Sequence, residues 1–131
     1  MKRLPPPTER KRRDLESPIQ RAILEAIWAA FPDVLAYSIP NGGYILDPRT
    51  VAKLKWLGLL PGMPDLGLLW TRGHGFIETK SERGVLSDDQ KSVHAILRAK
   101  GHNVEVCRSA DDAIRVLTGW SIPSRIQGRA A

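Results

Sequence analysis

Apolar side chains recur at intervals of three and four residues in four segments, and this spacing predicts amphipathic helices. The predicted helices are residues 14–31, 48–57, 87–100 and 109–118. Asp47 is the expected N-cap of the second, short helix, and Ser87 with Gln90 forms a capping box at the start of the third. Pro32 and Gly101 follow the first and third helices, where they are expected to end them.

Short apolar segments lie between these helices and predict four strands. They are residues 34–39, 63–70, 75–80 and 103–107, with a turn at 71–74 that makes the middle two a hairpin. The resulting order is helix, strand, short helix, strand, strand, helix, strand, helix. Alternation of this kind predicts an α/β fold in which helices flank a central sheet.

The two ends of the chain are predicted to lie outside this fold. Residues 1–13 contain three consecutive prolines and six Lys or Arg residues, so an extended or disordered arm is expected. Such an arm either follows DNA phosphates or is simply a solvated tail. The expected organisation is a flexible basic arm at 1–13, one domain at 14–118 and a loose tail at 119–131.

Composition and net charge indicate a single packed domain that binds a polyanion. A chain of 131 residues with 42% hydrophobic content suits one packed domain. Twenty Lys and Arg against fourteen Asp and Glu give a net charge of +6, which favours a polyanionic partner such as nucleic acid. A charge that serves only solubility is the alternative interpretation.

Cysteine usage and hydropathy indicate the compartment. Cys107 is the only cysteine, which excludes an internal disulfide and a multi-cysteine zinc site. It lies in a predicted strand, so we expect a buried thiol in a reducing environment. No apolar stretch approaches the roughly 18–20 residues that span a membrane, and the N-terminus lacks the apolar core of a secretory signal. We therefore expect a cytoplasmic protein with no membrane contact.

Three charged residues of the predicted hairpin are candidate catalytic residues. Asp65 comes near the start of its first strand, and Glu78 and Lys80 end its second. Residues two apart on a strand share a face, and hairpin pairing can bring Asp65 towards that face. Paired carboxylates suit Mg²⁺, which takes oxygen ligands, and a neighbouring lysine can offset charge on a reacting phosphate. This arrangement suggests metal-assisted phosphodiester hydrolysis. The structural alternatives are an ordinary Pro-Asp turn for Asp65 and a simple ion pair between Glu78 and Lys80.

The motifs around these residues sharpen the interpretation. Gly-Met-Pro-Asp (62–65), Phe-Ile-Glu-Thr-Lys (76–80) and Gly-Val-Leu-Ser-Asp-Asp-Gln (84–90) occur in that order. The series resembles the PD-(D/E)XK nuclease superfamily and, more closely, its VRR-NUC family, the virus-type replication-repair nucleases. The resemblance covers roughly residues 15–118 and departs at Thr79, where an apolar residue is usual. It implies a restriction-endonuclease-like α/β core with a mixed four-stranded sheet.

The resemblance also implies roles for further residues. Asp65, Glu78 and the Thr79 backbone carbonyl would hold Mg²⁺ or Mn²⁺, and Lys80 would lie near the scissile phosphate. The family's first helix carries a glutamate and a glutamine that reach the metal site, and Glu16 and Gln20 match them. Gln90 would lie beside the active site, and it could at the same time complete the capping box with Ser87. No organic cofactor is expected.

The implied activity is a divalent-metal-dependent DNA endonuclease that leaves 5′-phosphate and 3′-hydroxyl ends. The chain resembles stand-alone phage and bacterial members, which are thought to act as homodimers on branched DNA in the manner of Holliday-junction resolvases. DNA would be the partner, in replication, recombination or repair. The alternatives are a nuclease for flap or single-stranded DNA and a DNA-binding module with the same fold that does not cut.

Other residues could contact DNA or serve structure alone. Backbone N–H groups of Asn41, Gly42 and Gly43 could bind phosphate, or the segment could be an ordinary turn. Arg49, Lys53 and Lys55 on the short helix could contact the DNA backbone, or form a solvated face. No catalytic or metal-binding role is expected for the three histidines, which lack metal-ligand spacing: His74, His94 and His102. The four tryptophans are expected in the core or an interface: Trp28, Trp56, Trp70 and Trp120.

Overall fold

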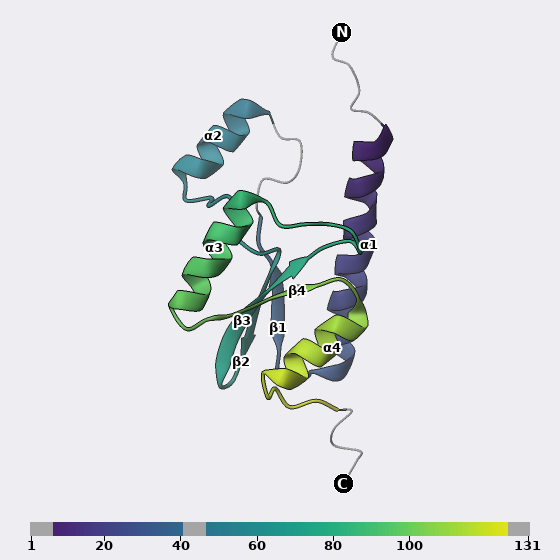
Figure 1. Cartoon of the computed structure of the whole chain (residues 1–131). Coiled ribbons are helices and arrows are strands. Elements are labelled where there is room, and N and C mark those ends of the chain that lie inside the picture. Colours follow the sequence, from purple (N-terminus) through teal and green to yellow (C-terminus); the bar gives the residue numbers. More distant parts are fainter. Residues whose placement is uncertain (1–6, 41–46, 126–131) are drawn as a thin grey trace. The chain divides into compact units, whose positions relative to one another are not determined.

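The predicted order of elements is confirmed in a computed structural model, which describes residues 7–40 and 47–125, with side chains from residue 15 onward (Figure 1). The helices are α1 (Pro7–Ala30), α2 (Pro48–Trp56), α3 (Asp88–Ala99) and α4 (Ala110–Gly119). The strands are β1 (Leu35–Ser38), β2 (Leu66–Trp70), β3 (Gly73–Thr79) and β4 (Asn103–Cys107). In the part of the chain that is described, no helix is both long and apolar enough to cross a membrane.

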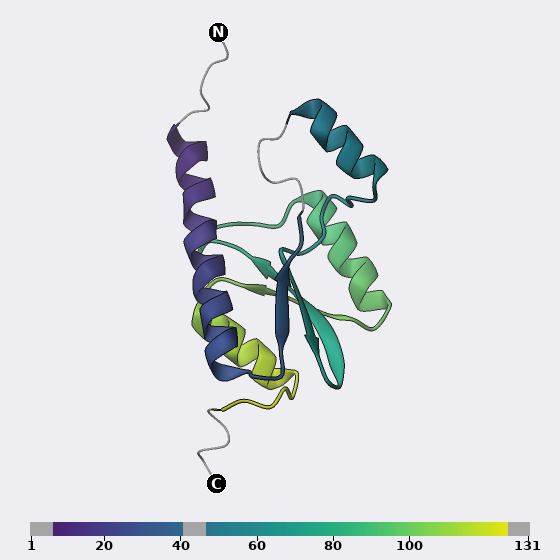
Figure 2. The same ribbon diagram turned by 180° about the vertical axis from the view of Figure 1, so that it is seen from behind.

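The four strands form one sheet in the order β1-β2-β3-β4. β1 pairs antiparallel with β2, and β2 pairs antiparallel with β3 (Figure 2). The sheet is mixed, so the remaining pair, β3 with β4, is parallel, and α3 provides the long connection that a parallel pair requires. The prediction of an α/β fold with a mixed four-stranded sheet is therefore confirmed.

Contacts divide the chain into two units, one of which contains the described residues 7–34, 79–84 and 106–125. In this first unit α1 packs against α4, and both helices bury apolar side chains, among them Ile23, Ile27 and Leu117. Ile122 is also buried, and the Arg125 N–H donates to the Ala30 carbonyl at 2.8 Å. Residues 120–125 are thus fixed to the unit, and the prediction of a loose tail is wrong for them because Ile122 supplies an apolar anchor.

The second unit contains residues 35–78 and 85–105 and carries most of the sheet together with α2 and α3. Its buried apolar side chains are Leu66, Leu68, Ile77, Val93 and Val104. β2 also contains Gly67, where an added Cβ would come within 2.2 Å of the Tyr37 ring. A glycine is needed there because the Tyr37 ring of β1 lies directly over the backbone of β2.

Two predicted boundaries are corrected by the structure. α1 begins at Pro7, seven residues before the predicted start, so residues 7–13 are helical rather than extended. Proline is tolerated in a first helical turn, and the Glu, Lys and Arg that follow have helix propensities close to that of leucine. The hairpin turn is tighter than predicted, because Gly73 and His74 belong to β3 and Trp70 pairs directly with Gly73.

Candidate active site

Asp65, which immediately precedes β2, and Glu78 of β3 lie at the open end of the hairpin. The pairing of β2 with β3 matches Leu66 with Ile77, and one further step along this register sets Asp65 opposite Glu78. Residues directly opposite each other share a face, with Cβ atoms about 4.5–5.5 Å apart. The Ile39 N–H donates to the Asp65 carbonyl at 2.8 Å, so β1 fixes the backbone of Asp65 from its other side.

Gly62 explains why a glycine precedes the Pro-Asp of the first motif. Its φ is +94°, and an added Cβ would lie 2.4 Å from the Asp89 carbonyl oxygen and 3.0 Å from the Gln90 nitrogen. The backbone of this segment therefore passes directly against the first turn of α3, and Pro64 beyond it is buried. The contact brings the start of α3 beside the segment that leads into Asp65.

Gln90 occupies that first turn of α3 and completes the predicted capping box. Its side-chain oxygen accepts from the Ser87 N–H at 2.9 Å, and its own N–H donates to the Ser87 hydroxyl at 3.2 Å. The structural role is confirmed, and the contact with Gly62 places Gln90 near the candidate site. The amide nitrogen of its side chain is not used by the capping box.

Glu78 is almost completely buried and lies against a histidine. Its side chain and that of His94 are each 1% exposed, and His94 Nε2 is 3.3 Å from Glu78 Oε1. The contact is a close polar pair rather than a well-aligned hydrogen bond. A buried carboxylate requires a polar or charged partner, and His94, one turn beyond Gln90 on α3, provides one.

The donor set at this end of the hairpin fits a hard cation. The residues that the structure describes include no group of three or more His, Cys, Asp or Glu side chains able to hold a metal. Two carboxylates nevertheless suffice for Mg²⁺, which typically keeps several waters and takes only one or two protein carboxylates. Asp65 and Glu78, opposite each other on the extended register, offer two carboxylates, and their role and that of the Thr79 carbonyl as metal ligands stay predictions.

Lys80 follows β3 directly and belongs to the first unit. Its side chain is only 8% exposed, and its N–H donates to the Cys107 carbonyl of β4 at 3.1 Å. Lysine is rarely so buried, since its ammonium group requires water or a partner. The bond to Cys107 fixes the backbone at Lys80, and the predicted burial of the Cys107 thiol is confirmed.

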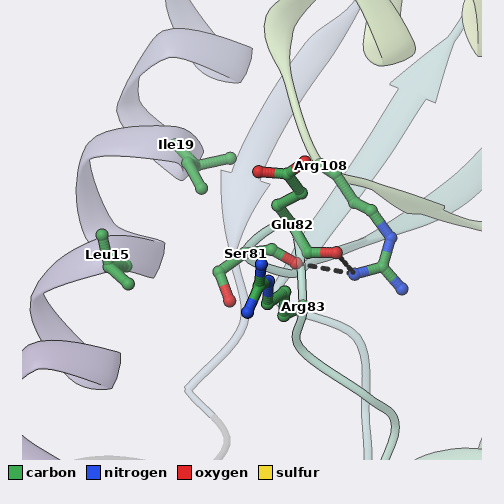
Figure 3. A pocket seen from close by; sticks show the side chains of 6 residues that line it. All are labelled: Leu15, Ile19, Ser81, Glu82, Arg83 and Arg108. Carbon is green, nitrogen blue, oxygen red and sulfur yellow. Dashed lines mark hydrogen bonds between the residues drawn. The ribbon is translucent and has the colours of Figure 1, made fainter. Parts of the chain in front are cut away.

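Arg108 organises the loop that follows Lys80 (Figure 3). Its Nη1 donates to the carbonyls of Ser81 at 2.6 Å, Glu82 at 3.2 Å and Gly84 at 2.7 Å. Arg108 directly follows Cys107 at the end of β4. This strand end therefore contacts Lys80 through the Cys107 carbonyl and the loop after Lys80 through the Arg108 guanidinium. One side chain thus bonds three loop carbonyls, of which that of Ser81 also accepts from the Gly84 N–H at 3.0 Å.

A pocket of about 430 Å³ lies beside this loop in the first unit. It is lined by Leu15 and Ile19 of α1 and by Ser81, Glu82, Arg83 and Arg108. The part of α1 that carries Glu16 and Gln20 therefore lies alongside the loop after Lys80. Both side chains are half-buried, and their metal and DNA roles stay predictions.

The remaining predicted contacts fall elsewhere. Asn41, Gly42 and Gly43 lie outside the described residues. Arg49, Lys53 and Lys55 are exposed on α2, whose N-cap is Asp47 as predicted. His74 and His102 face each other through their ring nitrogens at an exposed position in the second unit. Trp56 was predicted in the core or an interface; the core is ruled out because this residue is 83% exposed, and the interface stays a prediction.

Sequence reasoning missed two residues, His94 and Arg108. His94 was set aside because its spacing to other histidines does not form a metal site, and its partner is instead a distant carboxylate. A signal was available, because His94 lies four residues after Gln90 and therefore on the same face of α3. Arg108 gave no signal, because its partners are backbone carbonyls, which carry no sequence pattern.

Comparison with known proteins agrees with this geometry. The sequence model of the VRR-NUC domain matches residues 18–111, well over half of the chain. This range contains Asp65, Glu78, Lys80 and the capping box of α3. No curated protein matches the chain. VRR-NUC domains are nucleases of the PD-(D/E)XK type, and on this match the chain belongs to the VRR-NUC family.

Proposed function

We propose that this nuclease is a divalent-metal-dependent endonuclease that hydrolyses phosphodiester bonds in branched DNA. The observation that carries the proposal is the register of the hairpin, whose extension by one residue sets Asp65 opposite Glu78, with the buried Lys80 directly after β3. Two acids and a lysine at one strand end are the groups that metal-assisted hydrolysis of a phosphodiester requires.

Asp65 and Glu78 would hold Mg²⁺ or Mn²⁺ through their side chains, and Thr79 would contribute its carbonyl. When bound, the cation lowers the pKa of a bound water and polarises the phosphate. Glu16 would add a carboxylate from α1. The chain must therefore hold its carboxylates in place before the metal arrives, because a displaced ligand lowers the affinity of the whole set.

The protein residues have separate tasks in this mechanism. His94 would position the Glu78 carboxylate, since the two lie 3.3 Å apart and are shielded from water. Lys80 places an ammonium group near the scissile phosphate, where it offsets the negative charge that grows in the transition state. Gln90 can orient water or phosphate with the amide nitrogen that its capping box leaves available.

The proposal of a DNA substrate is supported by the family and the charge, and branched DNA and a homodimer are our further proposals. A net charge of +6 favours a polyanionic substrate. A homodimer would present two active sites to opposite strands of a four-way junction, which symmetrical resolution requires. The lone buried Cys107 suits a reducing compartment, so we propose that the enzyme acts in the cytoplasm of a bacterial or phage-infected cell.

The test is cleavage of a labelled four-way junction beside flap, single-stranded and linear duplex DNA of matched sequence. Each substrate is incubated with Mg²⁺, Mn²⁺ or EDTA, and the products are mapped at nucleotide resolution. Symmetrical nicks in the junction that require the metal support the proposal. If flap or single-stranded DNA is cleaved faster than the junction, the faster-cleaved DNA is the preferred substrate and the proposal of branched DNA is wrong. Tight binding without cleavage of any substrate contradicts the enzymatic proposal and leaves a binding module.

A further inference from the structure

α2 has one packed face and one outward face. None of its nine residues, all of which the structure describes, is buried, and only Val51 and Leu54 are half-buried. Successive residues of a helix are about 100° apart, so Val51 and Leu54 lie close together on one side. That side is the less exposed side of α2.

Arg49, Lys53 and Trp56 form a stripe on the outward side of α2. Their spacing of four and then three residues sets them within roughly 60° of one another, on the side opposite Val51 and Leu54. All three are exposed, and Trp56 is 83% exposed. The stripe therefore presents two cations and a large aromatic ring directly to solvent.

The chemistry of the stripe fits single-stranded nucleic acid. The sequence of α2 contains Arg49, Lys53 and Lys55 but no Asp or Glu, so phosphates meet no opposing acid within the helix. An exposed indole offers a flat surface on which an unpaired base can stack, whatever its sequence. In duplex DNA the bases are already stacked on one another, so this contact is available only where a strand is open.

We propose that the outward stripe of α2 binds unpaired DNA, with the Trp56 indole stacked on one base and Arg49 and Lys53 on the flanking phosphates. The proposal rests on the proposed nuclease function and adds the feature that would select branched over fully paired DNA. Open strands occur at junction centres, flaps and ends, where a stacking aromatic distinguishes them from the duplex arms.

The experiment measures the affinity of the full chain for a labelled single strand and for the matching blunt duplex. Fluorescence anisotropy is recorded in EDTA, where metal-dependent cleavage cannot occur. The Trp56→Ala variant is expected to bind the single strand between about 5-fold and 100-fold more weakly and the duplex as tightly as wild type. Trp56→Phe, which keeps a stacking ring, should restore single-strand affinity to within about threefold of wild type.

Trp28→Ala is the matched control. Trp28 is 47% exposed on α1, but Arg21 lies over its ring at 5.1 Å from the centroid, so this indole already has a partner. The control variant should bind both DNAs as wild type does. Lys53→Ala should weaken binding to single strand and duplex alike, and reduce the slope of log affinity against log salt by about 1.

Two results would overturn the proposal. One is a Trp56→Ala variant that binds the single strand like wild type, or loses affinity for both DNAs equally. The other is a change of oligomeric state in light scattering with unchanged DNA binding, which would assign Trp56 to a protein interface. Because binding is read without metal, these results are distinct from a failure of wild type to cleave, which would overturn only the nuclease function.

Discussion

His94 on α3 and Glu78 on β3 meet inside the second unit, with His94 Nε2 3.3 Å from Glu78 Oε1 and both side chains 1% exposed. Glu78 also lies opposite Asp65 in the register of the hairpin. Glu78 thus contacts an imidazole, and on the extended register it lies opposite a second carboxylate. An imidazole that carries its proton on Nε2 can turn the carboxylate, and thereby set the direction of the oxygen that remains for a cation.

Replacing His94 should weaken metal binding without removing either carboxylate. His94→Phe keeps the bulk of the ring but loses both nitrogens, and we expect metal affinity to fall by about 10-fold to 100-fold. The measurement is Mn²⁺ titration followed by electron paramagnetic resonance, together with the metal concentration that gives half-maximal cleavage.

Two further variants isolate the role of His94. His94→Gln can still donate from its amide, so it should recover part of the lost affinity. His74→Gln changes an exposed histidine of the same unit and should leave Mn²⁺ affinity unchanged. Wild-type affinity in a folded His94→Phe variant would show that His94 does not position Glu78.

Gly62→Ala should strongly destabilise the fold. A Cβ at this position would lie 2.4 Å from the Asp89 carbonyl oxygen, and the φ of +94° disfavours any side chain. Strain and steric overlap together should lower the free energy of unfolding by about 2–4 kcal/mol, measured by urea denaturation.

Gly101→Ala is a matched control for that change. Gly101 has a φ of +86°, but an added Cβ would have no neighbour within 4 Å. This variant should lose only the backbone contribution, about 1–2 kcal/mol. Equal losses at the two sites would mean that the contact between residue 62 and α3 does not restrict the backbone.

Arg108→Ala should slow catalysis more than it weakens DNA binding. The change removes the bonds to the carbonyls of Ser81, Glu82 and Gly84, so the loop after Lys80 loses its support. A displacement of about 1 Å can cost on the order of 100-fold in rate, so kcat should fall by about 10-fold to 100-fold. Single-turnover cleavage at saturating DNA measures this change.

Arg83→Ala separates loop support from simple charge. Arg83 lines the same pocket, and its removal leaves the three carbonyl bonds of Arg108 in place. We expect Arg83→Ala to keep near-normal kcat. If the two variants behave alike, Arg108 contributes a positive charge rather than the conformation of the loop.

Local signals in the sequence were sufficient for most of the fold. Ser87 and Gln90 satisfy each other across the start of α3 as predicted, because a capping box depends only on residues three apart. Helix and strand order was likewise predicted from periodicity. The start of α1 was not, because prolines near residue 7 suggested an extended arm whereas the helix continues back through the charged residues that follow them.

The candidate site was predicted only in part, since the contacts made by His94 and Arg108 join segments that are distant in the sequence. Asp65 and Glu78 were predicted to lie together because hairpin pairing is short-range and their motif is distinctive; the hairpin is confirmed, and their metal role stays a prediction. The support from His94 depends on how α3 crosses the sheet, and the support from Arg108 depends on where β4 ends. The core alternative for Trp56 failed because hydrophobicity predicts burial only on average, and this residue of α2 is exposed.

The central claim is that Asp65 and Glu78 together hold the catalytic metal. Its most direct test is single-turnover cleavage of a labelled junction in Mg²⁺ by wild type, Asp65→Asn and Glu78→Gln, with Glu82→Gln as an exposed acid control. Both site variants should lose at least about 100-fold in rate. The control should cut like wild type, and EDTA should abolish all cleavage. Metal-dependent cleavage at the wild-type rate in either site variant would contradict the claim.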